Sequence, residues 1–193
     1  MKLDLAYLPS AIANVNNLLT ELDAGKLREK FSDVLLEDSR IYREESIMKD
    51  STRKSKSIII DRTEELSWVF SLLDHIIFKV NKQIFNFDIN YTTNLQIAEY
   101  SVGSEYQWHW DIVTGDLPDL IEQRKLSLVI QLSYPEEYEG GEFQILAGSD
   151  IYTAEKLFGN ITVFPSWAVH RVLPVTKGIR KSLTCWVGGP NWK

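Results

Sequence analysis

Residues 94–102, NLQIAEYSV, and residues 126–134, LSLVIQLSY, belong to a series of short runs that decide the fold of this chain. The remaining runs are FNFDINY (85–91), YQWHWDIV (106–113), GEFQILAG (141–148), GNITVFPS (159–166), HRVLPVT (170–176) and KSLTCWVGG (181–189). All are rich in β-branched and aromatic residues, and Gly, Asn, Asp and Pro separate them. Such spacing is typical of an antiparallel sandwich or barrel. We therefore expect a jelly-roll-like double sheet after residue 85.

The first 84 residues have a different pattern. Apolar residues at helical spacing predict a helix over 10–31, and TEELSWVFSLLDHIIFKVNKQIF (63–85) predicts the longest helix, with Thr63 as its N-cap. Between them, 39–57 reads as a solvated loop and Ile58–Ile60 as a short strand. The expected architecture is α+β in a single domain of 1–193, with a mainly helical part (1–84) packed against the major sheet of a β-rich core (85–193).

Composition excludes several classes of protein. One cysteine among 193 residues rules out an intrachain disulfide framework and a cysteine-based zinc ribbon. The net charge of −6 argues against duplex nucleic acid as a partner. No apolar stretch has the length needed to cross a bilayer, and the first residues lack a signal-peptide pattern. We expect a cytoplasmic protein with no membrane partner, either a monomer or a homodimer.

Three residues suggest a metal site. His109 and Asp111 are two positions apart, so in an extended strand their side chains point to the same face. His170 lies 59 residues after Asp111, a separation that suits strands adjacent in a sandwich. Two imidazoles and one carboxylate leave half of the coordination sphere open, as in the facial triad of non-haem Fe(II) oxygenases. The same ligands also accept Zn²⁺, Mn²⁺ or Co²⁺.

A second feature follows ten residues after His170. Arg180, Ser182, Thr184 and Trp186 alternate, so on a strand they share one face. An arginine in a partly desolvated barrel mouth is costly unless an anion meets it, and guanidinium suits bidentate capture of a carboxylate. Ser182 offers a hydroxyl beside it. A small dicarboxylate could therefore bridge Arg180 and the metal.

Several motifs together resemble the Fe(II)/2-oxoglutarate-dependent dioxygenases, most closely the prolyl 4-hydroxylase-like branch. They are Tyr100-x-x-Gly103-x-x-Tyr106-x-x-His109-x-Asp111, Gly140-Gly141-Glu142-Phe143, Phe164-Pro165-Ser166, His170-Arg171-Val172 and Gly178-Ile179-Arg180-x-Ser182-Leu183-x-x-Trp186. The resemblance covers the chain from about residue 85 to the C-terminus. It implies a double-stranded β-helix (a distorted jelly roll) as the catalytic core.

The same resemblance implies the roles of individual residues. Iron would be bound by His109, Asp111 and His170, which form the catalytic centre, and the distal carboxylate of 2-oxoglutarate would pair with Arg180. Tyr100 would lie beside this cosubstrate, and Thr184 and Gln131 would line its pocket. Dioxygen is the second cosubstrate, and L-ascorbate is a further candidate cofactor. Lys181 follows Arg180 directly, but strand parity with Thr184 and Trp186 favours Arg180.

The expected activity is hydroxylation of a C–H bond with release of succinate and CO₂. The resemblance favours a prolyl residue of a peptide or protein, which the basic residues of 49–56 or the loop 112–125 could hold. The alternative is a free amino acid or another small metabolite, which a closed pocket with a second carboxylate clamp would favour. A jelly-roll metal- or ligand-binding module without turnover is the third hypothesis, but it leaves Arg180 without an anion.

Overall fold

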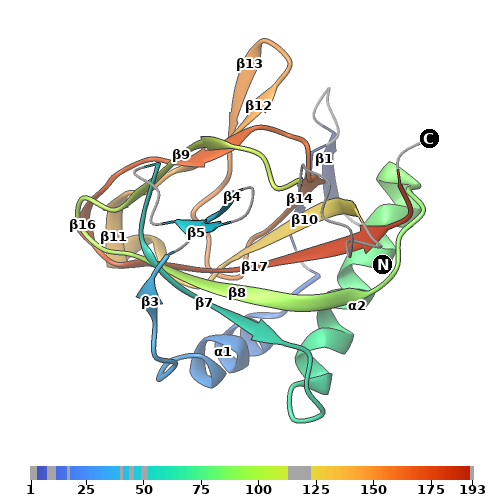
Figure 1. Cartoon of the computed structure of the whole chain (residues 1–193), viewed down its shortest axis with the longest axis horizontal. Coiled ribbons are helices and arrows are strands. Elements are labelled where there is room, and N and C mark those ends of the chain that lie inside the picture. Colours follow the sequence, from blue (N-terminus) through green and yellow to red (C-terminus); the bar gives the residue numbers. More distant parts are fainter. Residues whose placement is uncertain are drawn as a thin grey trace.

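Two facing β-sheets and two helices make up the computed structural model, which describes residues 4–7, 12–16, 18–39, 41–43, 46–48, 52–112 and 123–191 (Figure 1). The larger sheet has the strand order β1 (Asp4–Tyr7), β2 (Ala13–Asn16), β14 (Ile161–Pro165), β10 (Gln123–Gln131), β17 (Arg180–Gly189), β8 (Thr92–Tyr100), β7 (Lys56–Asp61) and β3 (Glu37–Asp38). The smaller sheet has the order β13 (Asp150–Thr153), β12 (Phe143–Ala147), β15 (His170–Val172), β9 (Glu105–His109) and β6 (Arg53–Lys54). Neighbouring strands in both sheets are antiparallel.

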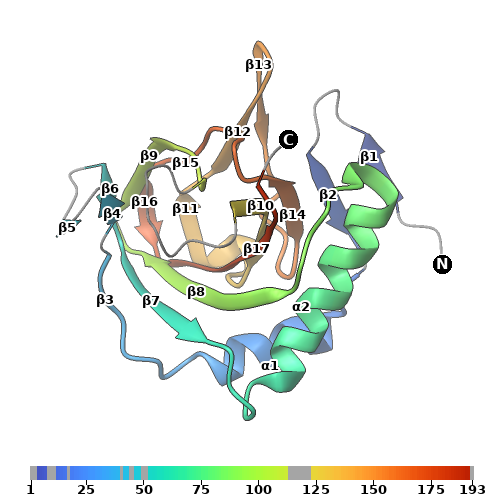
Figure 2. The ribbon, with the colours of Figure 1, turned by 45° about the vertical axis from the view of Figure 1, so that its right-hand side comes forward.

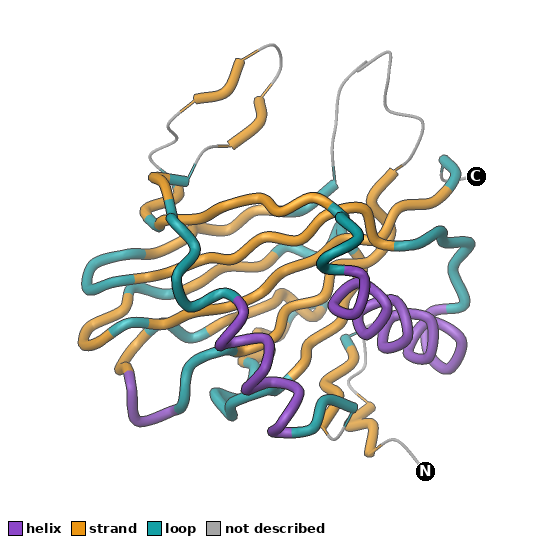
Figure 3. The backbone as a smooth tube through the Cα atoms, turned by 90° about the horizontal axis from the view of Figure 1, so that it is seen from below, coloured by secondary structure: helices purple, strands orange, loops and turns teal. Residues whose placement is uncertain are grey.

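Two short antiparallel strand pairs complete the β structure. They join β11 (Tyr138–Gly140) to β16 (Val175–Gly178) and β4 (Ile41–Arg43) to β5 (Ser46–Met48). The helices are α1 (Glu21–Lys30) and α2 (Ser67–Val80), which a π-helical turn extends over Asn81–Phe85, and Pro135–Glu137 form a 3₁₀ turn. Both helices lie outside the larger sheet, so the two sheets enclose the interior by themselves (Figures 2 and 3). Neither helix has the length and apolar character needed to span a bilayer in the described chain.

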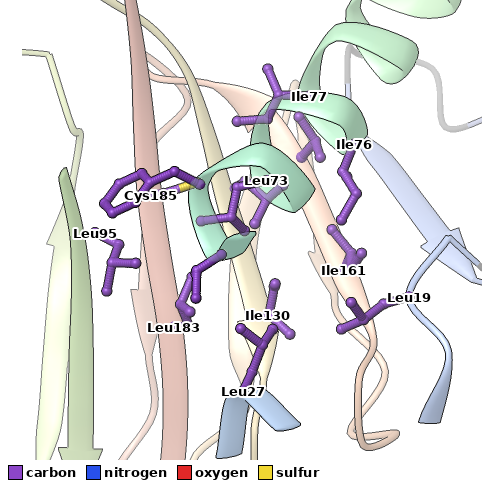
Figure 4. Close-up of a cluster of buried hydrophobic side chains, with 14 of the residues drawn as sticks. Leu19, Leu27, Leu73, Ile76, Ile77, Leu95, Ile130, Ile161, Leu183 and Cys185 are labelled. Atoms are coloured by element: carbon purple, nitrogen blue, oxygen red, sulfur yellow. The ribbon is translucent and has the colours of Figure 1, made fainter. Parts of the chain in front are cut away.

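The alternation of side chains along the strands separates two cores. On β10, Leu126, Leu128 and Ile130 point outward and are fully buried beneath the helices. Leu183 and Cys185 do the same on β17. They pack with Leu27 of α1 and with Leu73, Ile76 and Ile77 of α2 (Figure 4). Burial of such a side chain contributes about 1.5–3 kcal/mol, so this layer fixes the larger sheet in place.

The opposite face of the larger sheet lines the space between the sheets, and it is the polar one. Ser127, Gln131, Arg180 and Ser182 are buried there. Gln131 pairs with Ser182, and Arg180 pairs with Tyr100, in the β10–β17–β8 register. A second apolar cluster, which includes Phe143, Phe164 and Val172, fills the rest of this interior. The predicted α+β jelly roll, with helices against its major sheet, is therefore confirmed.

The prediction of a mainly helical part over residues 1–84 is wrong, because strands β1 to β7 lie there beside the two helices. The predicted helix 10–31 begins only at Glu21, where Thr20 is the N-cap. Residues 13–16 instead form β2, which extends the sheet by pairing with β14. Pairing with a distant strand satisfies this backbone and overrides the local helical pattern.

Two further predictions for this part need correction. The helix predicted from Thr63 begins at Ser67, and its N-cap position, Leu66, makes no side-chain capping bond. The predicted loop 39–57 contains β4, β5 and β6, and Arg53 is buried rather than solvated. Residues 49–51 of the basic segment, and 113–122 of the loop after Asp111, lie outside the described residues.

Candidate active site

Three side chains from two strands and an adjoining segment form a cluster with metal-ligand character. Register in the smaller sheet pairs His170 of β15 directly with His109, the last residue of β9. Asp111 follows two residues later and is held by a bond from its N–H to the carbonyl of Ser166, 2.8 Å long. One ligand atom from each of the three lies within 4.8 Å of the other two. The fold therefore brings the three candidate ligands together, although His170 lies 59 positions after Asp111 in the chain.

Both imidazoles are oriented by the backbone. Nδ1 of His109 is 2.8 Å from the carbonyl oxygen of Gln107, and Nδ1 of His170 is 2.9 Å from that of Ala168. A carbonyl accepts only, so each Nδ1 carries a proton and each Nε2 presents a lone pair. The two Nε2 atoms face Asp111, with separations of 3.9 Å from its Oδ1 for His109 and 3.6 Å from its Oδ2 for His170.

The protonation states also favour a divalent cation. Burial, reinforced by His170, lowers the pKa of His109 to about 3, so its ring is neutral at physiological pH. Burial opposes ionisation of Asp111, but the neighbouring histidines and the hydroxyl of Ser127 outweigh it and lower the pKa of this carboxyl. The Ser127 hydroxyl donates to Oδ2 of Asp111 over 2.7 Å. A neutral imidazole from His109 and an ionised, oriented carboxylate from Asp111, with the imidazole of His170 beside them, fit the nitrogen and oxygen donor set that Fe(II) prefers.

A pocket with about 270 Å³ of empty space, its open mouth included, lies between the sheets. Its lining includes Arg180, Gln131, Tyr138 and Lys156, together with Phe143. The Phe143 ring centroid is 5.7 Å from that of His170, so the pocket wall adjoins the metal cluster. The pocket therefore lies next to the candidate metal centre and has the cationic Arg180 in its lining.

Arg180 is the buried cation of this pocket, with 2% of its surface exposed. Its guanidinium reaches the Ser182 hydroxyl over a long 3.5 Å, and Tyr138 lines the same pocket. The carboxylates of the described residues form no ion pair with it. A buried guanidinium bonded only to neutral groups is a strong site for an anionic ligand.

The other predicted cosubstrate residues divide into two groups. Gln131 lines the pocket and donates to the Tyr138 hydroxyl over 2.9 Å. Tyr100 is buried, with its ring 5.4 Å below the Arg180 guanidinium. Thr184 lies on the same face of β17, opposite Val129, but it is not among the residues that line the pocket.

Among the lining residues that the sequence analysis did not predict, Tyr138 and Lys156 make the most informative contacts. The hydroxyl of Tyr138 accepts a hydrogen bond from the Gln131 amide, and burial raises the pKa of this hydroxyl. Lys156 donates to the carbonyl of Gly140 and to Glu142, at 2.7 and 2.8 Å. Tyr138 precedes the Gly140–Gly141 motif and could have been suspected on that ground. Lys156 lies in an irregular segment after β13, where no motif marks it.

The comparisons with known proteins agree with this geometry. Residues 95–188 match the family model described as the 2OG-Fe(II) oxygenase superfamily. A PKHD-type hydroxylase of Gloeothece citriformis (strain PCC 7424) is 37% identical over 95 residues, which are 49% of this chain and 42% of that protein. One from Acidovorax ebreus (strain TPSY) is 33% identical over 90 residues, 46% of this chain and 40% of that protein. The chain thus spans less than half the length of these relatives.

Solved structures are similar over nearly the whole chain. A Pseudomonas putida prolyl-4-hydroxylase superposes with a TM-score of 0.70 at 20% identity, covering 94% of both chains. A prolyl hydroxylase from Trichoplax adhaerens, in complex with a peptide fragment of the hypoxia inducible factor oxygen degradation domain, has a TM-score of 0.70 at 20% identity. That match covers 92% of this chain and 83% of the other. These matches show that the fold is the jelly roll of such hydroxylases.

Proposed function

We propose that this protein is a dioxygenase of the 2OG-Fe(II) oxygenase superfamily, whose family model residues 95–188 match, and that it hydroxylates a C–H bond. One observation carries the proposal. A cluster of two histidines and one aspartate adjoins a pocket that ends in the buried Arg180. A metal-binding module without turnover has no need for a buried arginine in a pocket beside the metal.

Each residue of the site has a role in this proposal. His109, Asp111 and His170 would hold Fe(II), which, together with 2-oxoglutarate and O₂, supplies the oxidation that yields succinate, CO₂ and the hydroxylated product. Arg180 binds the distal carboxylate of 2-oxoglutarate, and Tyr138 and Ser182 orient its guanidinium. Gln131 and Tyr100 shape the same end of the pocket. Exclusion of water by Phe143 and Phe164 strengthens these charge interactions.

We propose a prolyl group as the site of hydroxylation. The similarity to PKHD-type hydroxylases and to prolyl hydroxylase structures supports this choice. The peptide bound by the Trichoplax adhaerens protein supports a peptide or protein substrate. A free amino acid is the alternative within the same chemistry. Stimulation by ascorbate, a cytoplasmic location and a monomeric or dimeric state stay predictions from the sequence.

The proposal is tested by coupled product analysis. The purified protein with Fe(II), 2-oxoglutarate and O₂ is expected to form succinate and to add one oxygen atom to a prolyl compound. A chelator and the Asp111→Ala substitution should both abolish the two products. Chelator-resistant turnover would contradict the scheme, and bound metal without any consumption of 2-oxoglutarate would favour the binding module.

A further inference from the structure

Helix α1 precedes the stretch that the family model matches, yet it contacts segments that form the wall of the pocket. Arg28, in the last turn of this helix, donates from Nη1 and Nη2 to the two carboxylate oxygens of Glu137, over 2.9 and 2.7 Å. Glu137 directly precedes Tyr138, which lines the pocket. A guanidinium bonded to a carboxylate at two points fixes its position as well as its distance. Arg28 therefore holds the segment that carries Tyr138.

Glu137 connects this helix to further parts of the pocket. Its carboxylate also accepts a bond from the N–H of Tyr134, 2.9 Å away, and so closes the 3₁₀ turn before Tyr138. Its carbonyl oxygen lies against the turn that enters β17, where a Cβ on Gly178 would approach it to 1.9 Å. Arg180, the buried cation of the pocket, is two residues further on. A displacement of Glu137 would therefore disturb the positions of both Tyr138 and Arg180.

The same arginine reaches a second part of the wall through a stack of side chains. Its guanidinium lies over the ring of Tyr134, 5.4 Å from the centroid, and that ring stacks on Phe158 at 4.2 Å. Phe158 leads through Gly159 to Asn160, which lines the pocket. Helix α1 also packs directly on Gly159, since a Cβ there would lie 3.1 Å from that of Ala24. Both segments of the wall therefore rest on one helix.

The ion pair between Arg28 and Glu137 is charged and only partly shielded from water. The two side chains are 39% and 33% exposed. The bond with Arg28 lowers the pKa of Glu137, although burial opposes ionisation, so both groups are charged at neutral pH. An ion pair this exposed contributes little to the stability of a fold. It can still fix the geometry of a neighbouring binding site, where small displacements weaken binding.

We propose that Arg28 is a positioning residue for the cosubstrate, which through Glu137 and Tyr134 holds two segments of the pocket wall at the spacing that binds 2-oxoglutarate. The inference rests on the proposed function and extends the site to a part of the chain outside residues 95–188. Arg28 acts through other residues, since it is not among those that line the pocket. A purely structural ion pair would stabilise the fold without any effect on this binding.

The test compares cosubstrate affinity with stability. Binding of 2-oxoglutarate is measured anaerobically on Fe(II)-loaded protein from the visible absorption band of the complex, and stability from the melting temperature. Arg28→Gln should weaken 2-oxoglutarate binding about fivefold, the upper end of what a partly exposed ion pair contributes, and leave the affinity for Fe(II) unchanged. Arg28→Lys keeps the charge but not the two-point bond, so its loss should be smaller. Glu137→Gln should match Arg28→Gln, and the double variant should bind no more weakly than either, because all three remove the same interaction.

A control on the same helix separates positioning from support of the fold. Lys30 pairs with Glu65, and neither residue lines the pocket. Lys30→Gln should therefore keep the cosubstrate affinity of the unaltered protein, whatever its effect on the melting temperature. A second readout needs no metal. In the metal-free protein, Arg28→Gln should speed hydrogen exchange at the amides of 134–138 and 158–160, and Lys30→Gln should not.

Three results would overturn the inference. Unchanged 2-oxoglutarate affinity in Arg28→Gln, or an equal loss in Lys30→Gln, would make the Arg28–Glu137 pair a purely structural one. A parallel loss of Fe(II) affinity in Arg28→Gln would mean that the helix supports the metal cluster rather than the cosubstrate pocket. If the unaltered protein binds Fe(II) but not 2-oxoglutarate, the proposed function fails and the inference fails with it, whereas the first two results leave the proposed function intact.

Discussion

Removal of the Ser127 hydroxyl tests how the metal cluster is held. In Ser127→Ala, Oδ2 of Asp111 loses the donor 2.7 Å away, within a site where water does not readily replace it. The same bond fixes the orientation of the carboxylate, so its loss adds the cost of ordering this side chain to the binding of the metal. The three ligand residues themselves are unchanged. We therefore expect the variant to keep the three-residue metal site but to bind Fe(II) with lower affinity.

The size of this effect follows from the type of bond. A hydrogen bond to a charged group contributes about 1.5–3 kcal/mol, which corresponds to a weakening of Fe(II) binding by about 10- to 150-fold. Loss of an outer-shell partner of a metal ligand typically costs about 10- to 100-fold in affinity, which agrees. We predict a loss of about 10- to 100-fold for Ser127→Ala.

The assay is anaerobic competition for Fe(II) against a chromogenic chelator, with Ser166→Ala as the matched control. Ser166 is equally buried, and its Oγ lies 3.1 Å from that of Ser127 but makes no bond to the Asp111 carboxylate. Its loss should weaken Fe(II) binding by about threefold or less, the effect of a weak neutral hydrogen bond. Equal affinities of Ser127→Ala and the unaltered protein, or equal losses in both variants, would refute this account of Asp111.

Three other perturbations test separate parts of the structure. Tyr138→Phe removes the acceptor of the Gln131 amide and a partner of Arg180, so 2-oxoglutarate should bind about 3- to 10-fold more weakly in calorimetry; unchanged affinity would remove Tyr138 from the clamp. Gly178→Ala should lower the free energy of unfolding by about 2 kcal/mol or more, because φ is 71° and a Cβ would lie 1.9 Å from the carbonyl oxygen of Glu137. Gly25→Ala, in open space within α1, should raise that free energy by about 0.5–1 kcal/mol, and equal effects at both glycines would contradict the close approach. His109 has a pKa of about 3 in the folded protein against 6.5 in the unfolded chain, so the free energy of unfolding of the metal-free protein should fall as the pH falls from 6.5 towards 3. In urea unfolding, the free energy of His109→Gln should fall less steeply with pH. Identical pH dependence of the two proteins would refute the shift.

The sequence predicted the parts of the site that depend on local alternation. Arg180 and Ser182 share the interior face of β17 with Trp186, while Leu183 and Cys185 face the helices, as strand parity requires. His109 and Asp111 were paired by the same reasoning. The partnership with His170 required only that two distant strands be neighbours, and β9 and β15 are.

The features that the sequence did not predict depend on contacts between distant segments. Residues 13–16 form a strand because β14 is available to pair with them, and no local pattern reveals that partner. Tyr138 and Lys156 reach the pocket from a short strand and an irregular segment. In each case the role of the residue depends on its neighbours in the folded protein, and the local sequence does not reveal those neighbours.

The central claim is that His109, Asp111 and His170 hold iron beside a pocket in which Arg180 binds 2-oxoglutarate. It is tested most directly by anaerobic titration of the metal-free protein with Fe(II) and then 2-oxoglutarate, following the visible charge-transfer band of the chelated keto acid. We predict a band that is absent in Asp111→Ala and that needs about 30-fold or more cosubstrate in Arg180→Gln, whose Fe(II) affinity is unchanged. A protein that binds Fe(II) but gives no band with saturating 2-oxoglutarate would contradict the account.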